Sequence, residues 1–251
     1  MTKFAHDNIV PDSSSSLEKK QQVAGMFDDI AKRYDFLNRL LSAGIDKGWR
    51  KKAIAQLKDL QPKKVLDVAT GTADVALMTH KALKPQTIIG IDISDGMLEL
   101  GRKKIEKQGL QNIITLFNGD SEQINYPENS FDAVTVAFGV RNFQNLEKGL
   151  QEMLRVLRPG GKLVVLEFSK PKQTGFKGLY KFYMNVVAPK AGSMFAKNKD
   201  AYQYLNESVQ AFPEREQFTE VMKQTGYKGI YFKPLSLGIC CIYVGTKETG
   251  K

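Results

Sequence analysis

Short β-branched apolar runs alternate with amphipathic segments along the chain, and this alternation restricts the folds that it can adopt. Five such runs lie between residues 64 and 169: "KVLDVA" (64–69), "TIIGID" (87–92), "IITLFNGD" (113–120), "FDAVTVAFG" (131–139) and "KLVVLEFS" (162–169). Nearly continuous apolar strands separated by helical segments indicate a parallel sheet covered by helices on both faces. Because crossovers between parallel strands are right-handed, we predict a doubly wound, Rossmann-like α/β fold.

Helical and antiparallel segments extend this core at both ends. Apolar residues recur at helical spacing from Val23 to Leu41, which predicts an amphipathic helix. Two late strands, "KGIYFKPL" and "GICCIYVGTK", are joined by a short connection that makes them antiparallel. We therefore expect a seven-stranded, mostly parallel sheet with an antiparallel C-terminal strand. The predicted single domain, 17–251, comprises a helical N-terminal arm or lid (17–62), a core (63–169), a helical insertion (170–212) and a C-terminal helix with two strands (213–251).

Composition indicates only in broad terms where the protein is located and what kind of partner it binds. Residues 1–16 contain "PDSSSS" and few apolar side chains, so we predict a loose tail without the apolar run of a secretory signal. No stretch of about 18 apolar residues occurs, and we expect a cytoplasmic protein. The net charge of +10 favours an anionic partner, nucleic acid or a lipid surface, although a merely soluble basic surface explains it equally well.

The cysteines and histidines do not form a recognisable metal site. Cys240 and Cys241 are adjacent in an apolar run, where successive side chains point to opposite faces of a sheet. We expect both to be small core residues of a reducing compartment. His6 lies in the predicted tail and His80 on a predicted helix. No metal is therefore expected.

Acidic residues stand at or near the ends of the first three strands. The loops after the first four strands are "DVATGTAD", "GIDIS", "NGDS" and "AFGVRN", and the first three contain Asp67, Asp92 and Asp120. In a doubly wound sheet such loops meet at the carboxyl edge and form one ligand site. Asp92 follows Gly71 by twenty-one residues, the spacing at which an acid meets a ribose hydroxyl pair. Each acid alone is equally well explained as a turn or cap residue, but their shared position favours a site.

The turn around Gly71 discriminates between nucleotide cofactors. A dinucleotide fingerprint would have glycines where Thr70, Thr72 and Ala73 stand, so the turn argues against binding of a pyrophosphate. Three carboxylates attract a cation instead, and Gly71 lets the backbone approach it closely. S-adenosylmethionine combines a sulfonium, an ammonium, a ribose diol and an adenine amine. We expect it as the cofactor, bound by the three strand-end acids and Gly71.

Three segments resemble the ubiquinone/menaquinone biosynthesis C-methyltransferases, a family of class I methyltransferases. They are "RYDFLNRLLSAGIDKGWRK" (33–51), "FGVRN" (138–142) and "RVLRPGGKLVVLEFSKP" (155–171), within a similarity that runs from about 24 to 245. The resemblance implies that Thr72 contacts the methionine end of the cofactor, Asp92 the ribose hydroxyls, and Asp120 and Ser121 the adenine. The family usually has glycine, histidine and serine at three positions where this chain has Ala73, Asp46 and Ala137.

The resemblance also implies a reaction, the C-methylation of a reduced demethylmenaquinone, a quinol with a polyprenyl tail. A phenol ionises near pH 10, so the phenolate must be favoured by a cation or a base. Arg141 is expected to stabilise the phenolate, Asn142 to orient its oxygen, and Tyr34 or a water to accept the proton. A structural ion pair is the other interpretation of Arg141, and core packing that of Tyr34.

Several alternatives stay open. The acceptor can be a benzoquinol of the ubiquinone pathway. The basic charge suits a nucleic-acid methyltransferase, although the Asn/Asp-Pro-Pro-aromatic loop and the Pro-Cys nucleophile typical of such enzymes are absent, and we expect no nucleic acid as partner. A non-catalytic nucleoside-binding module is the third alternative. A lipid-borne substrate further predicts transient, peripheral contact with an anionic membrane surface at the inner face of the cell membrane, and a homodimer is left open.

Overall fold

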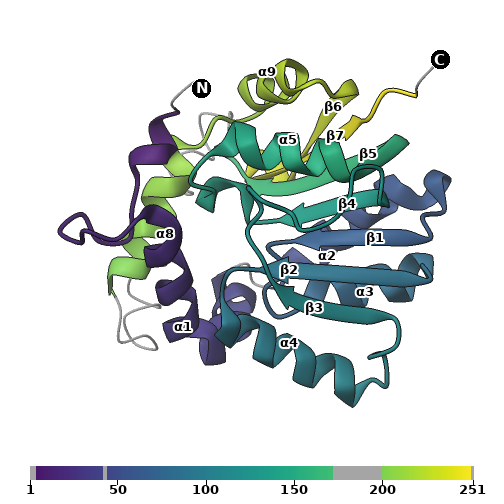
Figure 1. The fold of residues 1–251 in the computed structure, drawn as a ribbon. Helices are drawn as coiled ribbons and strands as arrows, with labels where there is room; N and C mark the ends of the chain where they lie inside the picture. Colours follow the sequence, from purple (N-terminus) through teal and green to yellow (C-terminus); the bar gives the residue numbers. More distant parts are fainter. Residues whose placement is uncertain (1–3, 42–43, 172–198, 250–251) are drawn as a thin grey trace.

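A computed structural model of the protein describes residues 4–41, 44–171 and 199–249 (Figure 1). For residues 33–41 and 199–202 it describes the backbone alone. Most of the predicted insertion, 172–198, therefore lies outside the described residues.

Seven described strands form one sheet in the order β3-β2-β1-β4-β5-β7-β6 (Figure 1). Strands β1 to β5 are mutually parallel, and β7 runs antiparallel to both of its neighbours, β5 and β6. The doubly wound α/β fold with an antiparallel C-terminal strand is thus confirmed. The strands are β1 Lys64–Val68, β2 Thr87–Asp92, β3 Ile114–Asn118, β4 Phe131–Ala137, β5 Leu157–Phe168, β6 Lys228–Leu235 and β7 Cys240–Thr246.

Helices cover both faces of the sheet, because successive side chains of each strand point to opposite sides. Val65 of β1 shares an apolar core with α2, α3 and α4, whereas Leu66 shares one with α5 and α9. Cys240 and Cys241 are free thiols buried in these two cores, as expected. The covering helices are α2 Asp46–Ile54, continued by the 3-10 helix η2 Ala55–Leu60, α3 Asp74–Leu83, α4 Asp95–Lys107, α5 Leu146–Val156 and α9 Glu216–Thr225.

Side-chain caps fix where two of these helices begin. Ser94 Oγ accepts the backbone N–H of Met97 at 3.2 Å at the start of α4, and Asn145 Oδ1 accepts that of Lys148 at 2.9 Å at the start of α5. Ser94 lies just after β2, and Asn145 ends the loop that follows β4, so both caps help to set the path of loops at the carboxyl edge. Two further 3-10 helices occupy loops, η3 Val140–Asn142 after β4 and η5 Ser236–Gly238 between β6 and β7.

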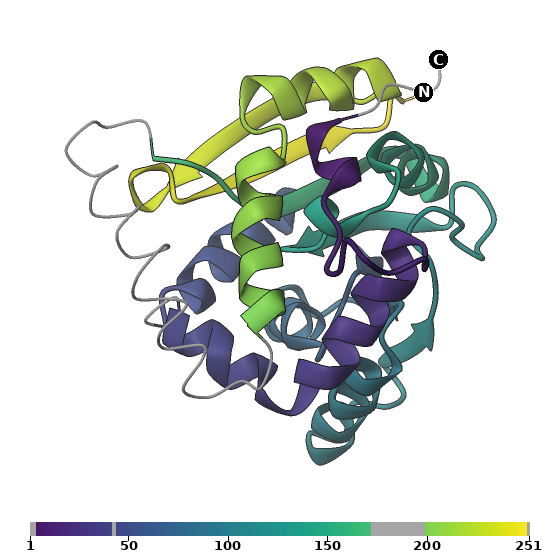
Figure 2. The same cartoon turned by 90° about the vertical axis from the view of Figure 1, so that its left-hand side faces the viewer.

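Two further helices, α1 Lys19–Leu41 and α8 Lys199–Ala211, lie beside the carboxyl edge of the parallel strands (Figures 1 and 2). Asp28 of α1 accepts the hydroxyl of Ser94 at 2.6 Å and the backbone N–H of Gly96 at 2.8 Å, which holds α1 against the start of α4. Val23 of α1 and Tyr204 of α8 share a small apolar cluster. No helix within the described residues is long and apolar enough to cross a membrane.

Residues 4–16 differ from the loose tail expected from the sequence. They contain the 3-10 helix η1 Ala5–Asn8, and the fully buried ring of His6 lies 5.4 Å from that of Phe212. Lys19 Nζ donates a hydrogen bond of 2.6 Å to the His6 carbonyl. Burial, assisted by the charge of Lys19, lowers the pKa of His6 to about 3, so the imidazole is neutral. The segment is polar overall, so its composition did not predict that a few aromatic side chains hold it against the protein.

Candidate active site

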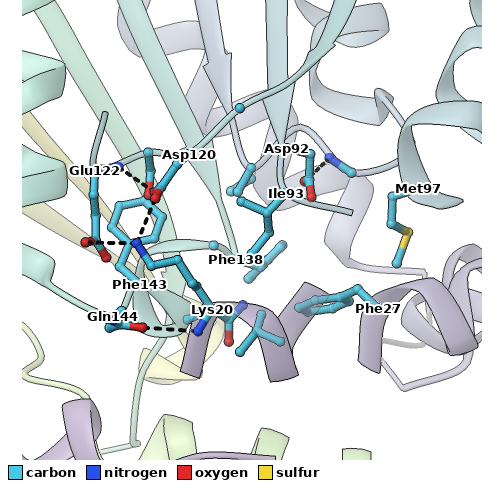
Figure 3. A pocket seen from close by; sticks show the side chains of 18 residues that line it. Lys20, Phe27, Asp92, Ile93, Met97, Asp120, Glu122, Phe138, Phe143 and Gln144 are labelled. Carbon is cyan, nitrogen blue, oxygen red and sulfur yellow. Dashed lines mark hydrogen bonds and ion pairs between the residues drawn. The ribbon is translucent and has the colours of Figure 1, made fainter. Parts of the chain in front are cut away.

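The loops after β1, β2, β3 and β4 enclose a cavity at the carboxyl edge of the sheet, and α1 borders it (Figure 3). Its empty space is about 660 Å³, including the open mouth. Five of the residues predicted for the site line it: Gly71, Asp92, Asp120, Ser121 and Asn142.

Asp92 joins two of the loops. Its Oδ2 accepts the backbone N–H of Gly71 at 2.8 Å, and its Oδ1 accepts that of Ser94 at 2.9 Å. Gly71 has a φ of +54°, the left-handed conformation that glycine adopts readily. Withdrawal from bulk water raises the pKa of Asp92 to about 6, against the opposing effect of the backbone N–H groups of Ser94, Gly71 and Ile93. The carboxylate therefore stands at the cavity wall with both oxygens held in place.

Asp67 and Thr72 differ from expectation, since neither lines the cavity. The buried carboxylate of Asp67 accepts the hydroxyls of Thr70 and Thr135, each at 2.6 Å, beneath the turn. Burial raises its pKa to about 6, and the two hydroxyls oppose that shift. Thr72 is buried too, and its hydroxyl accepts a hydrogen bond of 2.8 Å from Lys104. Both side chains support the turn, and their contact with a ligand stays a prediction.

Asp120 interacts with a residue of α1. Lys20 Nζ lies 3.0 Å from Asp120 Oδ2 and 3.9 Å from Glu122 Oε2 (Figure 3). Glu122 in turn accepts the backbone N–H of Asn145 at 2.7 Å through its other oxygen. With Asp92, the cavity wall thus carries three carboxylates and one ammonium group, an excess of negative charge that suits a cationic ligand.

Arg141 also differs from its predicted position. Its Nη1 donates to Glu167 Oε1 at 2.8 Å and to the Phe138 carbonyl at 2.6 Å, and its guanidinium lies over the ring of Phe168. Arg141 is 5% exposed and Glu167 is fully buried, and Arg141 does not line the cavity. Burial raises the pKa of Glu167, and the charge of Arg141 opposes this. The carboxylate attracts the guanidinium beneath the loop, so the geometry favours the structural ion pair.

Asn142, the next residue, does face the cavity, and its Oδ1 accepts the hydroxyl of Tyr204 at 3.1 Å. Tyr34 lies within α1, but its side chain is outside the described residues. Of the two residues predicted for catalysis whose side chains the structure describes, it brings Asn142 to the cavity and not Arg141.

Apolar side chains that the sequence did not assign to the site line much of the rest of the cavity. Phe27 projects from α1 and Met97 from α4 (Figure 3). Their apolar spacing was a visible signal, but it could not distinguish a cavity wall from ordinary core. Gly139 brings two loops together here, because a Cβ at its position would lie 2.5 Å from the Cβ of Ala69.

The model of the ubiE/COQ5 methyltransferase family matches residues 15–247. The chain belongs to this family. It is 43% identical to the demethylmenaquinone methyltransferase of Bacteroides fragilis, covering 97% of this chain and 99% of the relative. It is 45% identical to the ubiquinone/menaquinone biosynthesis C-methyltransferase UbiE of Geobacter sulfurreducens, covering 92% and 90% of the two chains. These relatives confirm the resemblance inferred from the sequence.

Solved structures show the same fold at lower identity. A SAM-dependent methyltransferase from Thermotoga maritima superimposes with a TM-score of 0.62 at 16% identity, covering 90% of this chain and 99% of that chain. Several described non-glycine residues of this ubiE/COQ5 methyltransferase have a positive φ, and Ala73 is one of them. Ala73 has a φ of +64°, where the family usually has glycine, and an L-residue in that conformation costs about 1 to 2 kcal/mol.

Proposed function

We propose that this methyltransferase uses S-adenosylmethionine to methylate a ring carbon of a reduced demethylmenaquinone. Family membership supports methyl transfer, and the names of the Bacteroides fragilis and Geobacter sulfurreducens relatives support a quinol as the acceptor. The observation that supports the cofactor best is Asp92, fixed at the wall of a cavity that the loops after four parallel strands enclose.

The residues of the cavity fit S-adenosylmethionine. Asp92 would accept the ribose diol, and Asp120 with Ser121 would face the adenine. Carboxylates at the wall favour the positive charge of the cofactor, and apolar side chains such as Phe27 and Met97 suit its adenine and the flat ring of a quinol. When bound, the cofactor supplies an electrophilic methyl group.

Two features of the chain would assist the reaction. Asn142 can donate its amide N–H groups to the acceptor oxygen, which stabilises negative charge as the phenol ionises. Helix α1 covers the cavity, tied to the core through Lys20 and Asp28, and would exclude water and hold methyl donor and ring carbon together. The proton acceptor is assigned to a water or to Tyr34.

A polyprenyl quinol resides in a bilayer, so we further propose that the enzyme binds reversibly to an anionic membrane surface. Lys51 and Lys52 on α2 are exposed, as are Lys103 and Lys107 on α4. Arg50, in the same basic run as Lys51, is instead buried and paired with Asp46. Each exposed basic residue near an anionic surface contributes about 1 kcal/mol to binding.

Methyl transfer from labelled S-adenosylmethionine to chemically reduced demethylmenaquinone tests the proposal. Product carrying the label on a ring carbon, identified by mass spectrometry, is the expected result. A matched assay with a demethylated benzoquinol of equal prenyl length distinguishes the two quinone pathways. Cofactor binding without transfer to either quinol would overturn the proposal and favour a nucleoside-binding module, and transfer only to nucleic acid would favour that class of enzyme.

A further inference from the structure

Tyr204 connects α8 to the loop that follows β4. Its hydroxyl donates a hydrogen bond of 3.1 Å to Oδ1 of Asn142, a residue 62 positions earlier in the chain. Figure 2 shows α8, in light green, beside the purple helix α1, so Tyr204 comes from the layer that covers the carboxyl edge. Tyr204 lies within the helical insertion, 170–212, that the sequence predicts.

The environment of Tyr204 keeps its hydroxyl a donor. The side chain is 2% exposed and packs with Val23 and Met26 of α1. Burial is the largest effect on its pKa and raises it above the ordinary value, against the opposing charge of Arg141. The hydroxyl is therefore protonated throughout the neutral range and can serve Asn142 as a fixed donor.

The hydrogen bond acts on the side chain of Asn142, since the backbone of its loop is held by other contacts. The N–H of Asn142 donates to the Gly139 carbonyl at 2.9 Å, and the buried pair of Arg141 and Glu167 anchors the preceding residue. What the Tyr204 hydroxyl adds is the orientation of the carboxamide. With Oδ1 occupied, both N–H groups of Nδ2 are free to face the acceptor side of the cavity.

We propose that Tyr204 is a positioning residue for methyl transfer, which fixes the Asn142 carboxamide so that its amino group donates to the oxygen of the quinol acceptor. The proposal rests on the function proposed above. A fixed donor costs no reorientation when charge develops on the acceptor oxygen, so the interaction strengthens in the transition state. Loss of the Tyr204 hydroxyl should thus lower kcat more than it changes substrate binding.

Tyr204→Phe removes the hydroxyl and keeps the ring. We expect kcat to fall by about tenfold, because the free energy of one hydrogen bond corresponds to about a tenfold change in rate. KM for the quinol and Kd for the cofactor should stay within about twofold of wild type. Tyr227→Phe is the matched control, because the Tyr227 hydroxyl, also buried, donates to the Leu150 carbonyl at 3.0 Å outside the cavity. It should lower thermal stability and leave kcat unchanged.

A double-mutant cycle with Asn142→Ala identifies the route of the effect. If Tyr204 acts through Asn142, Tyr204→Phe should lower kcat in the wild-type background and have no further effect on Asn142→Ala. Equal effects in both backgrounds, full kcat in Asn142→Ala, or full kcat in a folded Tyr204→Phe would each overturn the proposal. Absence of methyl transfer by the wild-type enzyme would instead overturn the proposed function and this inference with it.

Discussion

Lys20 Nζ lies 3.0 Å from Asp120 Oδ2, so an ion pair joins the N-terminal helix α1 to the loop after β3. The negative charges of Asp120 and Glu122 raise the pKa of Lys20, chiefly through the hydrogen bond to Asp120. Asp120 is also the residue expected to meet the adenine. One carboxylate therefore faces both the helix that covers the cavity and the ligand that must enter beneath it.

Lys20→Met should speed cofactor association. Removing the ammonium group frees Asp120 and weakens one of the interactions that hold α1, and a pair this exposed contributes at most about 1 kcal/mol, or roughly a fivefold change in rate. Stopped-flow binding of the cofactor at low and high salt measures the effect, which should shrink as salt screens the pair in the wild type. Lys103→Met, which breaks the exposed pair with Glu99, is the control. Identical association rates for all three proteins would contradict this gating role.

Asp92→Ala should weaken cofactor binding. Loss of a charged acceptor leaves the ribose hydroxyls without a partner, at a cost of about 1.5 to 3 kcal/mol, or roughly 10- to 150-fold in Kd. Calorimetric titration measures the change. Asp95→Ala, which removes an exposed acid three residues further along, should bind normally. Unchanged affinity in folded Asp92→Ala would remove Asp92 from the site.

Cofactor affinity should decrease as the pH falls below about 6. The pKa of Asp92 is raised to about 6, and only the ionised carboxylate accepts from both ribose hydroxyls. Affinity should be constant above this pH and fall by up to tenfold per unit below it. Asp92→Asn should bind weakly with no such dependence, and an equal pH slope in this variant would assign the titration elsewhere.

Because the folded-state pKa is raised, this carboxyl also makes the free energy of unfolding fall as the pH rises from about 4 to 6.

Glu167→Gln should destabilise the protein. The substitution leaves the charge of Arg141 buried without a counter-ion, and breaking a buried pair costs about 3 to 5 kcal/mol. Urea denaturation followed by circular dichroism gives the free energy of unfolding. Glu99→Gln, at an exposed pair, is the matched control and should change it little. A Glu167→Gln protein with wild-type stability would show that this pair does not anchor the loop.

Lys51→Gln with Lys52→Gln should weaken binding to anionic vesicles, because both side chains are exposed on α2. Sedimentation with anionic and neutral vesicles measures binding. The wild type should bind only the anionic vesicles and should dissociate from them at high salt. Lys223→Gln with Lys228→Gln removes the same charge from α9 and β6. Equal losses in the two double variants would indicate a general charge effect, and wild-type binding independent of lipid and salt would contradict electrostatic attachment.

The sequence predicted the elements that depend on local pattern and missed the contacts that depend on distant partners. Alternating apolar strands and helices determine the sheet, and strand-end acids such as Asp92 reach the cavity because the carboxyl edges of parallel strands coincide. Arg141 was misplaced because its partner, Glu167, lies 26 residues away on β5. Lys20 pairs with Asp120, which lies 100 residues further along the chain, and no local sequence pattern indicates this contact. Asp67 shows a further limit, since a strand-end acid can turn inward to two threonine hydroxyls.

The position of β7 in the sheet affects the order in which strands can pair while the chain is synthesised. β7 follows β6 in the sequence yet inserts between β5 and β6, and β6 has no other partner among the described strands. While the chain is synthesised, β6 therefore emerges before the strand that it must pair with, and one edge of β5 keeps its N–H and C=O groups unpaired until β7 follows. Such an edge can pair with a neighbouring chain. A nascent chain that has not yet produced β7 should thus depend on chaperones, whereas one that has produced it can close its own sheet.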